Sequence, residues 1–387
     1  MTTSAPGLTG KIVVTGLPRQ SGESAERCGS GDNGVDLNCF NEELRSVVRS
    51  KGIEAAFGLL ATRYVSDKDP AACHWSAHQI GDEVYRQESG GAPFAFARSS
   101  YYCGYGFYHG YLEALLRTNP DPQIQKTKIL AFCDSVEKTF RGESKDNCFH
   151  GIGSGFTENP PPQHVYGNIA TLTAPGLKAC DVLFGGTGRE WEVCTTGVFA
   201  VPANFMSQNK YDFVFDPADP FVFCAKLPPN YHRACYGEFS AKMERITQGD
   251  LSKVASFLPR IKEPEYQRLV VRVAAAVMLQ RVARQASPEK RLMECRSIFE
   301  GDLQYACLDG VVWGFLYHGP LNHEHEQALN FCAEPALASE DREFCYTRLF
   351  ARINNMFPPE KARAACSAAP AELRERCRLT TPSDLSS

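Results

Sequence analysis

The sequence predicts an all-α protein, built from helical-hairpin repeats that are stapled by disulfides and curved into a solenoid or an α/α toroid. Three observations predict this fold. The sixteen cysteines fall into neighbouring couples, apolar residues recur at helical intervals, and no convincing run shows the alternation of a strand. A chain of 387 residues is long enough for such an array.

The cysteines form eight couples, and in seven of them ten to fourteen residues separate the partners, which is the reach of a loop between antiparallel helices. An exported chain gains roughly 3 kcal/mol from each closed loop in the chain-entropy model, whereas a cytosolic chain is kept reduced. We therefore expect eight disulfides and an extracytoplasmic location: periplasmic, secreted or at the cell surface. The couples are Cys28 with Cys39, Cys73 with Cys103, Cys133 with Cys148, Cys180 with Cys194, Cys224 with Cys235, Cys295 with Cys307, Cys332 with Cys345 and Cys366 with Cys377.

Helical patterns occur along most of the chain. The first is capped by Asn41 and keeps its apolar spacing over residues 42–64. Cys133 is expected to close one helix and Cys148 to open the next, with a polar turn between them. Further patterns cover residues 72–86, 99–117, 124–140, 170–183, 238–248, 265–284, 288–299 and 340–356.

Composition suggests three parts along the chain. Residues 1–27 are rich in Gly, Ser, Thr and Pro and are expected to form an extended or disordered arm. Residues 28–387 are expected to form a single α-helical repeat domain. Within it, residues 204–223 carry five phenylalanines and a tyrosine, which predicts an inserted aromatic loop that packs onto the body or onto a partner.

A shared pattern, Cys-x-x-Gly-x-x-x-Gly, begins at Cys103, Cys148 and Cys307, and Cys194 keeps its first half. The first three of these four cysteines in chain order, Cys103, Cys148 and Cys194, are 45 and 46 residues apart, a period typical of helical-hairpin repeats. Glycines four residues apart share one helix face and let a neighbouring helix approach closely. We expect this structural role for them.

The bulk composition excludes several functions. The net charge is −4, and the mixed charges form no basic stripe, so no nucleic acid is expected as a partner. The most apolar pattern, residues 269–282, is interrupted by Arg272 and Arg281 and is shorter than the ~20 residues that span a bilayer. No membrane-spanning segment is therefore expected.

The N-terminal residues conflict with export, because residues 1–27 lack the charged and apolar regions of a secretory signal. We expect the signal or anchor to have been removed or to lie outside this chain. The alternative is a cytoplasm that tolerates disulfides, as in hyperthermophiles.

Familiar catalytic and binding motifs are missing. The sequence has no Cys-x-x-Cys, P-loop, Gly-x-Ser-x-Gly or His-Glu-x-x-His. The Asp- and Asn-rich loop between Cys28 and Cys39 lacks the ligand order of a calcium loop, so calcium binding there is not expected.

Histidines at helical spacing predict a metal site. His74 and His78 are four residues apart, His109 and Glu113 repeat that spacing, and His150 lies on a third helix. Such pairs on adjacent helices are how helical bundles build metal sites, and imidazole with carboxylate suits zinc, iron or copper. The expected cofactor is one such ion and otherwise none. The nearby candidates for a general base are Asp82, Glu83 and Glu113.

Two other interpretations of the histidines stay open. Those beside Tyr101, Tyr102, Tyr105, Tyr108 and Tyr111 can form hydrogen bonds inside a polar aromatic core without a metal. A second group, His318, His323 and His325, lies around Pro320 and Asn322 and is expected to form a surface turn, with metal binding as the alternative.

The segments CGYGFYHGYLEALL, CFHGIGSGF and CHWSAHQIG resemble a group of uncharacterised bacterial extracytoplasmic proteins with repeated Cys-Phe/Tyr-His-Gly helices. The resemblance covers residues 40–160, and the remainder through cysteine spacing alone. It implies no activity. The group implies a histidine where this chain has Ser154, so one ligand or acid/base of a strictly repeated site is absent.

Two function classes follow, and the sequence does not decide whether the protein is an enzyme. In the first, His74, His78, His109, Glu113 and His150 converge on the concave side and hold a metal ion. In the second, the array is a non-catalytic scaffold or structural subunit that docks onto another protein through residues 1–27 or 204–223.

Overall fold

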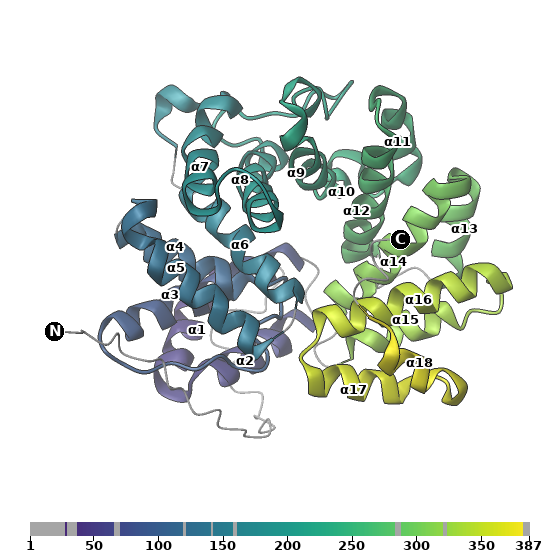
Figure 1. The fold of residues 1–387 in the computed structure, drawn as a ribbon, viewed down its shortest axis with the longest axis horizontal. Helices are drawn as coiled ribbons and strands as arrows, with labels where there is room; N and C mark the ends of the chain where they lie inside the picture. The colour runs from purple at the N-terminus through teal and green to yellow at the C-terminus, as the bar shows by residue number, and fades with distance from the viewer. Residues whose placement is uncertain are drawn as a thin grey trace.

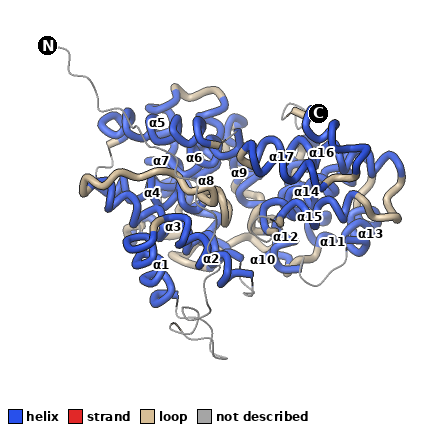
Figure 2. Tube along the Cα trace, turned by 90° about the horizontal axis from the view of Figure 1, so that it is seen from below, coloured by secondary structure: helices blue, strands red, loops and turns tan. Residues whose placement is uncertain are grey.

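The structure is a computed structural model, and it describes residues 28, 37–65, 70–118, 121–140, 142–157, 161–282, 288–319 and 323–381. Within these ranges the chain forms helices and connecting loops, and no strand occurs (Figure 2). The predicted all-α class is confirmed. The arm, residues 1–27, and the loop after Cys28 lie outside the described residues.

The helices have the following bounds: α1 Leu37–Lys51, α2 Ile53–Val65, α3 Pro70–Ser89, α4 Gly106–Thr118, α5 Pro122–Thr139, α6 Gly142–Thr157, η1 Gln163–Val165, α7 Ile169–Phe184, α8 Arg189–Gln208, η2 Cys224–Lys226, α9 Pro229–Ser240, α10 Met243–Thr247, α11 Leu251–Phe257, η3 Leu258–Arg260, α12 Pro264–Val282, α13 Pro288–Ile298, α14 Gly301–His318, α15 Glu324–Cys332, α16 Ser339–Met356, α17 Pro359–Ala368, η4 Ala371–Leu373 and α18 Arg374–Leu379.

Three predicted helices were wrong in their extent. The pattern over 42–64 is divided between α1 and α2, because Gly52 has φ +87° and interrupts the helix. The helix expected from residue 99 begins at Gly106, since Cys103, Gly104 and Tyr105 all have positive φ. The helix expected over 238–248 is two helices, α9 and α10.

All eight predicted cysteine couples are disulfide-bonded, which confirms the pairing of sequence neighbours. The bonds join Cys28 to Cys39, Cys73 to Cys103, Cys133 to Cys148, Cys180 to Cys194, Cys224 to Cys235, Cys295 to Cys307, Cys332 to Cys345 and Cys366 to Cys377.

Most bridges join consecutive helices. Cys345 ties α16 to α15, Cys377 ties α18 to α17, and Cys235 ties α9 to the short helix η2. The bridge between Cys133 and Cys148 links α5 to α6. We expected Cys133 to close its helix and Cys148 to open the next, but both lie inside their helices. The helix α5 continues past Cys133 to Thr139, and α6 begins at Gly142, six residues before Cys148. This staple therefore ties two helix bodies together.

The helices succeed one another around a common centre, from α1 through α8 and α9 to α17 (Figure 1). Contacts between residues far apart in sequence join the two ends of this arrangement. Lys361 of α17 donates to both carboxylate oxygens of Glu324 at 2.6 Å, and Tyr101 donates to the same carboxylate at 3.2 Å. Glu324 is only 2% exposed, so Tyr101 crosses the junction to a carboxylate that is held in a buried ion pair.

Glycines hold the inner helix pairs together, as the repeated pattern predicts. A methyl group on Gly106, Gly110, Gly197 or Gly310 would lie 1.8 to 2.4 Å from a backbone oxygen of the neighbouring helix. These contacts join α4 to α3, α8 to α6, and α14 to α12. No other residue type allows backbones to approach so closely, so the structural role of the pattern is confirmed.

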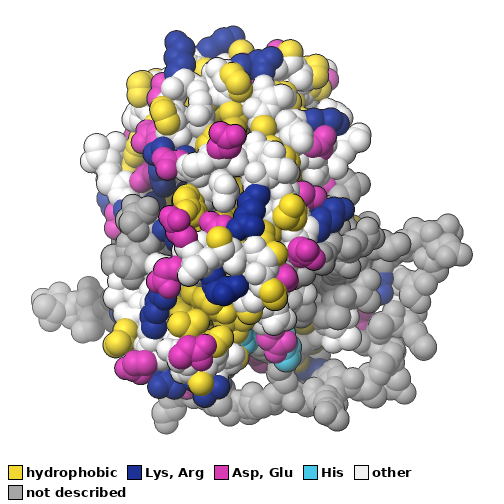
Figure 3. Space-filling view, turned by 90° about the vertical axis from the view of Figure 1, so that its right-hand side faces the viewer, with side chains coloured by type: hydrophobic (Ala, Val, Ile, Leu, Met, Phe, Trp, Pro, Cys, Tyr) yellow, Lys and Arg dark blue, Asp and Glu magenta, His cyan; other side chains and the backbone are white. Residues whose placement is uncertain are grey.

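The aromatic segment 204–223 packs onto the body of the protein. Its first residues belong to α8, and the loop after them buries Phe213 and Phe221, each only 1% exposed. Val214, at 61% exposure, points outward. On the face shown in Figure 3, basic and acidic side chains are intermixed rather than gathered into a field of one sign. Among the described residues, no helix combines the length and the apolar character needed to cross a membrane.

The close approach of α3 and α4 predicts a strong effect of a single methyl group. Gly110→Ala would place Cβ 2.0 Å from the His78 carbonyl oxygen, so the two helices must separate. We expect the free energy of unfolding in urea to fall by at least about 2 kcal/mol. Gly90→Ala is the control, because its nearest contact would be 3.4 Å away. Equal stabilities of the two variants would contradict the packing described.

The buried junction predicts a second stability difference. Lys361→Met leaves the Glu324 carboxylate buried without its cation, and the free energy of unfolding should fall by about 3 kcal/mol. Arg98→Met removes a second ion pair at the same junction, which Arg98 forms with Glu360. The side chains of Arg98 and Glu360 are 55% and 64% exposed. That change should cost less than about 1 kcal/mol. A loss of similar size in both variants would show that the junction does not depend on the buried pair.

Candidate metal centre

A cavity of about 1520 Å³ lies between the helices. Residues of α3, α4, α6, α8, α9, α10, α12, α14, α15 and α16 line it, so most of the chain contributes to its wall. The lining is rich in charged side chains and includes His74, His78, His109 and His150. The site expected on the concave side of the array therefore faces this cavity.

Three of the predicted ligands meet at the wall of this cavity. His74 and His78 lie on α3 and His109 on α4, and ligand atoms of the three side chains all lie within 4.8 Å of one another. The glycines of α4 make this possible, because Gly106 and Gly110 pack directly against the backbone of His74 and His78. The four-residue spacing on α3 places both of its imidazoles on one face.

In each of the three imidazoles, the nitrogen that points away from the other two rings, called the outer nitrogen below, has a hydrogen-bond acceptor. Nδ1 of His74 lies 3.0 Å from the carbonyl oxygen of Cys103. Nδ1 of His78 lies 3.1 Å from the carboxylate of Glu113. His109 forms a hydrogen bond with the backbone of Asn147 that raises its pKa, which identifies a carbonyl acceptor. Because carbonyls and carboxylates only accept, these partners place the ring proton of each neutral histidine on its outer nitrogen.

The inner nitrogens are consequently left with lone pairs. Nε2 of His74 and Nε2 of His78 face each other at 3.0 Å. Nε2 of His109 is buried and has no hydrogen-bond partner. Three lone pairs directed into one small volume repel one another unless a cation lies between them.

A proton is a poor candidate for that cation. Burial lowers the pKa of His74 well below its usual value, and the neighbouring His78 lowers it further. Burial also lowers the pKa of His109, with a further contribution from His150. Removal from water disfavours an imidazolium here. A metal ion coordinated by neutral imidazoles satisfies the same lone pairs without protonation.

His150 lies beside the cluster. Its ring stacks on that of His109 with centroids 5.0 Å apart, and its Nδ1 lies 2.8 Å from the hydroxyl of Thr196. Burial, together with Lys242, lowers the pKa of His150 to about 4. His150 is therefore a neutral neighbour of the three-histidine group at physiological pH.

Glu238 of α9 is a site residue that the sequence does not reveal. Its carboxylate lies 3.7 Å from Nδ1 of His150, and it lines the cavity. Burial raises its pKa to about 7, although Lys242 acts in the opposite direction. A carboxyl group with such a pKa can accept or release a proton near neutral pH. Thr196 and Lys242 complete these surroundings and were likewise not predicted.

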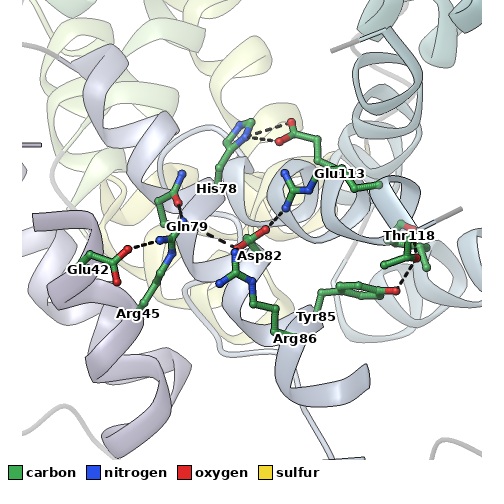
Figure 4. A network of polar contacts seen from close by, with 11 residues as sticks. Glu42, Arg45, His78, Gln79, Asp82, Tyr85, Arg86, Glu113 and Thr118 are labelled. Carbon is green, nitrogen blue, oxygen red and sulfur yellow. Dashed lines mark hydrogen bonds and ion pairs between the residues drawn. The ribbon is translucent and has the colours of Figure 1, made fainter. Parts of the chain in front are cut away.

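None of the predicted carboxylates lines the cavity. Glu113 contacts His78 in a smaller pocket that Asp82 also lines (Figure 4). Asp82 pairs with Arg86 at 2.8 Å and with Arg117, and Glu83 pairs with Arg49 at 2.9 Å. Glu113 thus orients the imidazole of His78 through its Nδ1, and Asp82 and Glu83 form ion pairs with arginines.

The second histidine group does not form one site in the described part of the chain. His318 lines the cavity, His325 is 8% exposed, and His323 pairs with Glu326 at 2.7 Å on the surface. The expected surface turn therefore describes His323 but not its two neighbours; Pro320 and Asn322 lie outside the described residues. Ser154, where the resemblance implies a histidine, donates to backbone carbonyls of α6 and also lines the cavity.

Comparison with family models, with curated proteins and with solved structures finds no match to this chain.

His318 predicts a pH dependence of stability. Burial lowers its pKa to about 3 in the folded protein, against about 6.5 when unfolded. Between these values the unfolded chain binds the extra proton, so the stability that neutral His318 contributes is complete above pH 6.5 and is lost as the pH falls.

His318→Asn should therefore lose less stability than wild type between pH 7.5 and pH 5, by up to about 2 kcal/mol in urea titrations with chelator present. His164→Asn changes an exposed histidine and should follow wild type. The same pH slope in His318→Asn and wild type would refute the assignment.

Proposed function

We propose that this chain is an extracytoplasmic protein that binds a transition metal ion through His74, His78 and His109, in the cavity of a disulfide-stapled α/α toroid. One observation carries the proposal. Each of the three imidazoles has its outer nitrogen on a carbonyl or carboxylate acceptor, while its inner nitrogen is directed toward the other two. Metal-binding histidines in proteins have this arrangement of second-shell partners.

The donor set suits zinc, copper or iron, which imidazole nitrogen binds well. These three residues would hold the ion and would leave a position of a tetrahedral zinc ion for water or a ligand, and such an ion would supply a bound water with a pKa of about 7. His74, His78 and His109 all line the cavity, from which such a ligand would approach. Glu238 and His150 line the same cavity, with the Glu238 carboxylate 3.7 Å from Nδ1 of His150.

The disulfides support the proposed location. All sixteen cysteines are bridged, and no free thiol remains for a reducing compartment to maintain. The bridge between Cys73 and Cys103 also belongs to the site, because Cys73 precedes His74 and the Cys103 carbonyl accepts from that histidine. Oxidation of this pair would therefore help to fix the first ligand.

Docking onto another protein stays a prediction. The arm at residues 1–27 lies outside the described residues. The aromatic segment 204–223 buries Phe213 and Phe221 within its own body, and these rings are not available to a partner. The metal site is therefore the function that the described residues support best.

The metal proposal predicts one ion per chain. Protein purified without a histidine tag should contain, or take up after chelation, one zinc ion per chain by elemental analysis and competition titration. His109→Ala removes a ligand and should weaken zinc affinity by more than about 100-fold, whereas Glu113→Gln removes only the partner of His78 and should weaken it by about 10- to 100-fold.

The matched control is His164→Ala, at an exposed histidine, which should bind zinc as wild type does. Circular dichroism establishes that each variant is folded. A wild-type protein that takes up no metal, or a His109→Ala variant with unchanged affinity, would overturn the proposal.

A further inference from the structure

A cluster of three arginines and one aspartate forms another part of the cavity wall. Asp309 of α14 accepts from Arg348 at 2.9 Å and from Arg352 at 2.8 and 2.9 Å, both on α16. Arg272 of α12 approaches the same carboxylate less closely, at 3.8 Å. All four residues line the cavity.

The cluster carries an excess of positive charge. Burial works to raise the pKa of Asp309, but Arg352, Arg348 and Arg272 hold it at about 2, so the carboxylate is ionised. Burial lowers the pKa of Arg272 to about 10, which still leaves the guanidinium charged at neutral pH. Three cations and one anion leave a local charge of +2 on the cavity wall.

Two of the arginines have a structural explanation and the third does not. Arg348 and Arg352 are 6% and 7% exposed and join α16 to α14 through Asp309. The guanidinium of Arg352 also stacks 5.3 Å above the ring of Trp313, which fixes its orientation. Arg272 is different, because its side chain is 28% exposed in the cavity and its contact with Asp309 is the longest.

The position of Arg272 is rigid nevertheless. Gly310 packs against its backbone, and a methyl group on that glycine would lie 2.2 Å from the Arg272 carbonyl oxygen. This is the same close approach that sets His74 and His78 against α4. A guanidinium held on a rigid helix beside two buried, oriented cations is preorganised for an oxyanion, because arginine donors match the geometry of phosphate oxygens.

We propose that Arg272, Arg348 and Arg352 form a binding site for a phosphate dianion, as the free ion or as the terminal phosphate of a ligand in the cavity. The charge of the dianion equals the local excess of +2, and phosphate carries close to two negative charges above its second pKa of about 6. The site does not depend on the metal, since none of its residues belongs to the histidine group.

The experiment is isothermal titration with inorganic phosphate at pH 7.5 and low salt, on the full chain treated with chelator. Wild type should bind one phosphate per chain. Arg272→Gln should weaken phosphate binding by about tenfold to a hundredfold, because one charged donor is lost. Arg268→Gln is the matched control, one turn earlier on α12 and paired with Asp302, and should stay within about twofold of wild type.

Three further arms make the outcome decisive. Chelator-treated and zinc-loaded wild type should bind phosphate with the same affinity, and saturable binding by the zinc-loaded protein alone would assign the anion to the metal site instead. Acetate, a monoanion, should bind at least about tenfold more weakly than phosphate, and equal affinity would refute the charge matching. Arg272→Lys keeps the charge without the planar donors and should lie between wild type and Arg272→Gln, which tests the site even if the glutamine variant fails to fold.

Absence of saturable phosphate binding to wild type, or equal affinities of wild type and Arg272→Gln, would overturn the proposal.

Discussion

The close approach of helix backbones at glycine is the constraint on which the rest of this structure depends. Where α4 meets α3, the glycines remove the side chains that would separate the helices, and His109 is brought against His74 and His78. Overpacking such a contact is unfavourable, so the spacing of the imidazoles is fixed by the backbone rather than by flexible side chains. The disulfides then keep the helices joined, and Tyr101 joins the two ends of the arrangement through its hydrogen bond to Glu324, whose carboxylate is held by Lys361.

The repeated pattern also explains why polar residues recur around the cavity. At three of the four occurrences the residue just before the first glycine lines the cavity: His150 in α6, Thr196 in α8 and Asp309 in α14. Each of these glycines packs against a partner helix, which positions the preceding residue at the rim of the contact. The same glycine contact between helices thus lies beside different side chains: imidazoles near α3 and α4, and an arginine cluster near α12 and α16. The proposed metal and phosphate sites therefore lie on different helices of a common scaffold.

Much of the fold could be predicted because disulfide couples and amphipathic helices are local signals. Helices buried on nearly all sides gave no amphipathic run from which to predict their bounds; α8 and α14 bury residues around their circumference and so lack an apolar stripe. The three proposed ligands, His74, His78 and His109, could be predicted from their spacing and from the shared pattern. Glu238 was not, since α9 brings it to His150 only through the arrangement of the whole array. Glu113 has the spacing of a ligand, but that spacing cannot show that it contacts Nδ1 of His78 in a separate, smaller pocket.

Anomalous diffraction from crystals of the zinc-loaded protein tests the central claim most directly. The account predicts one anomalous peak, about 2.0 to 2.1 Å from Nε2 of each of His74, His78 and His109, with Cys103, Glu113 and Asn147 on the outer nitrogens. A map of the zinc-loaded protein that has no anomalous peak between the three imidazoles would contradict it.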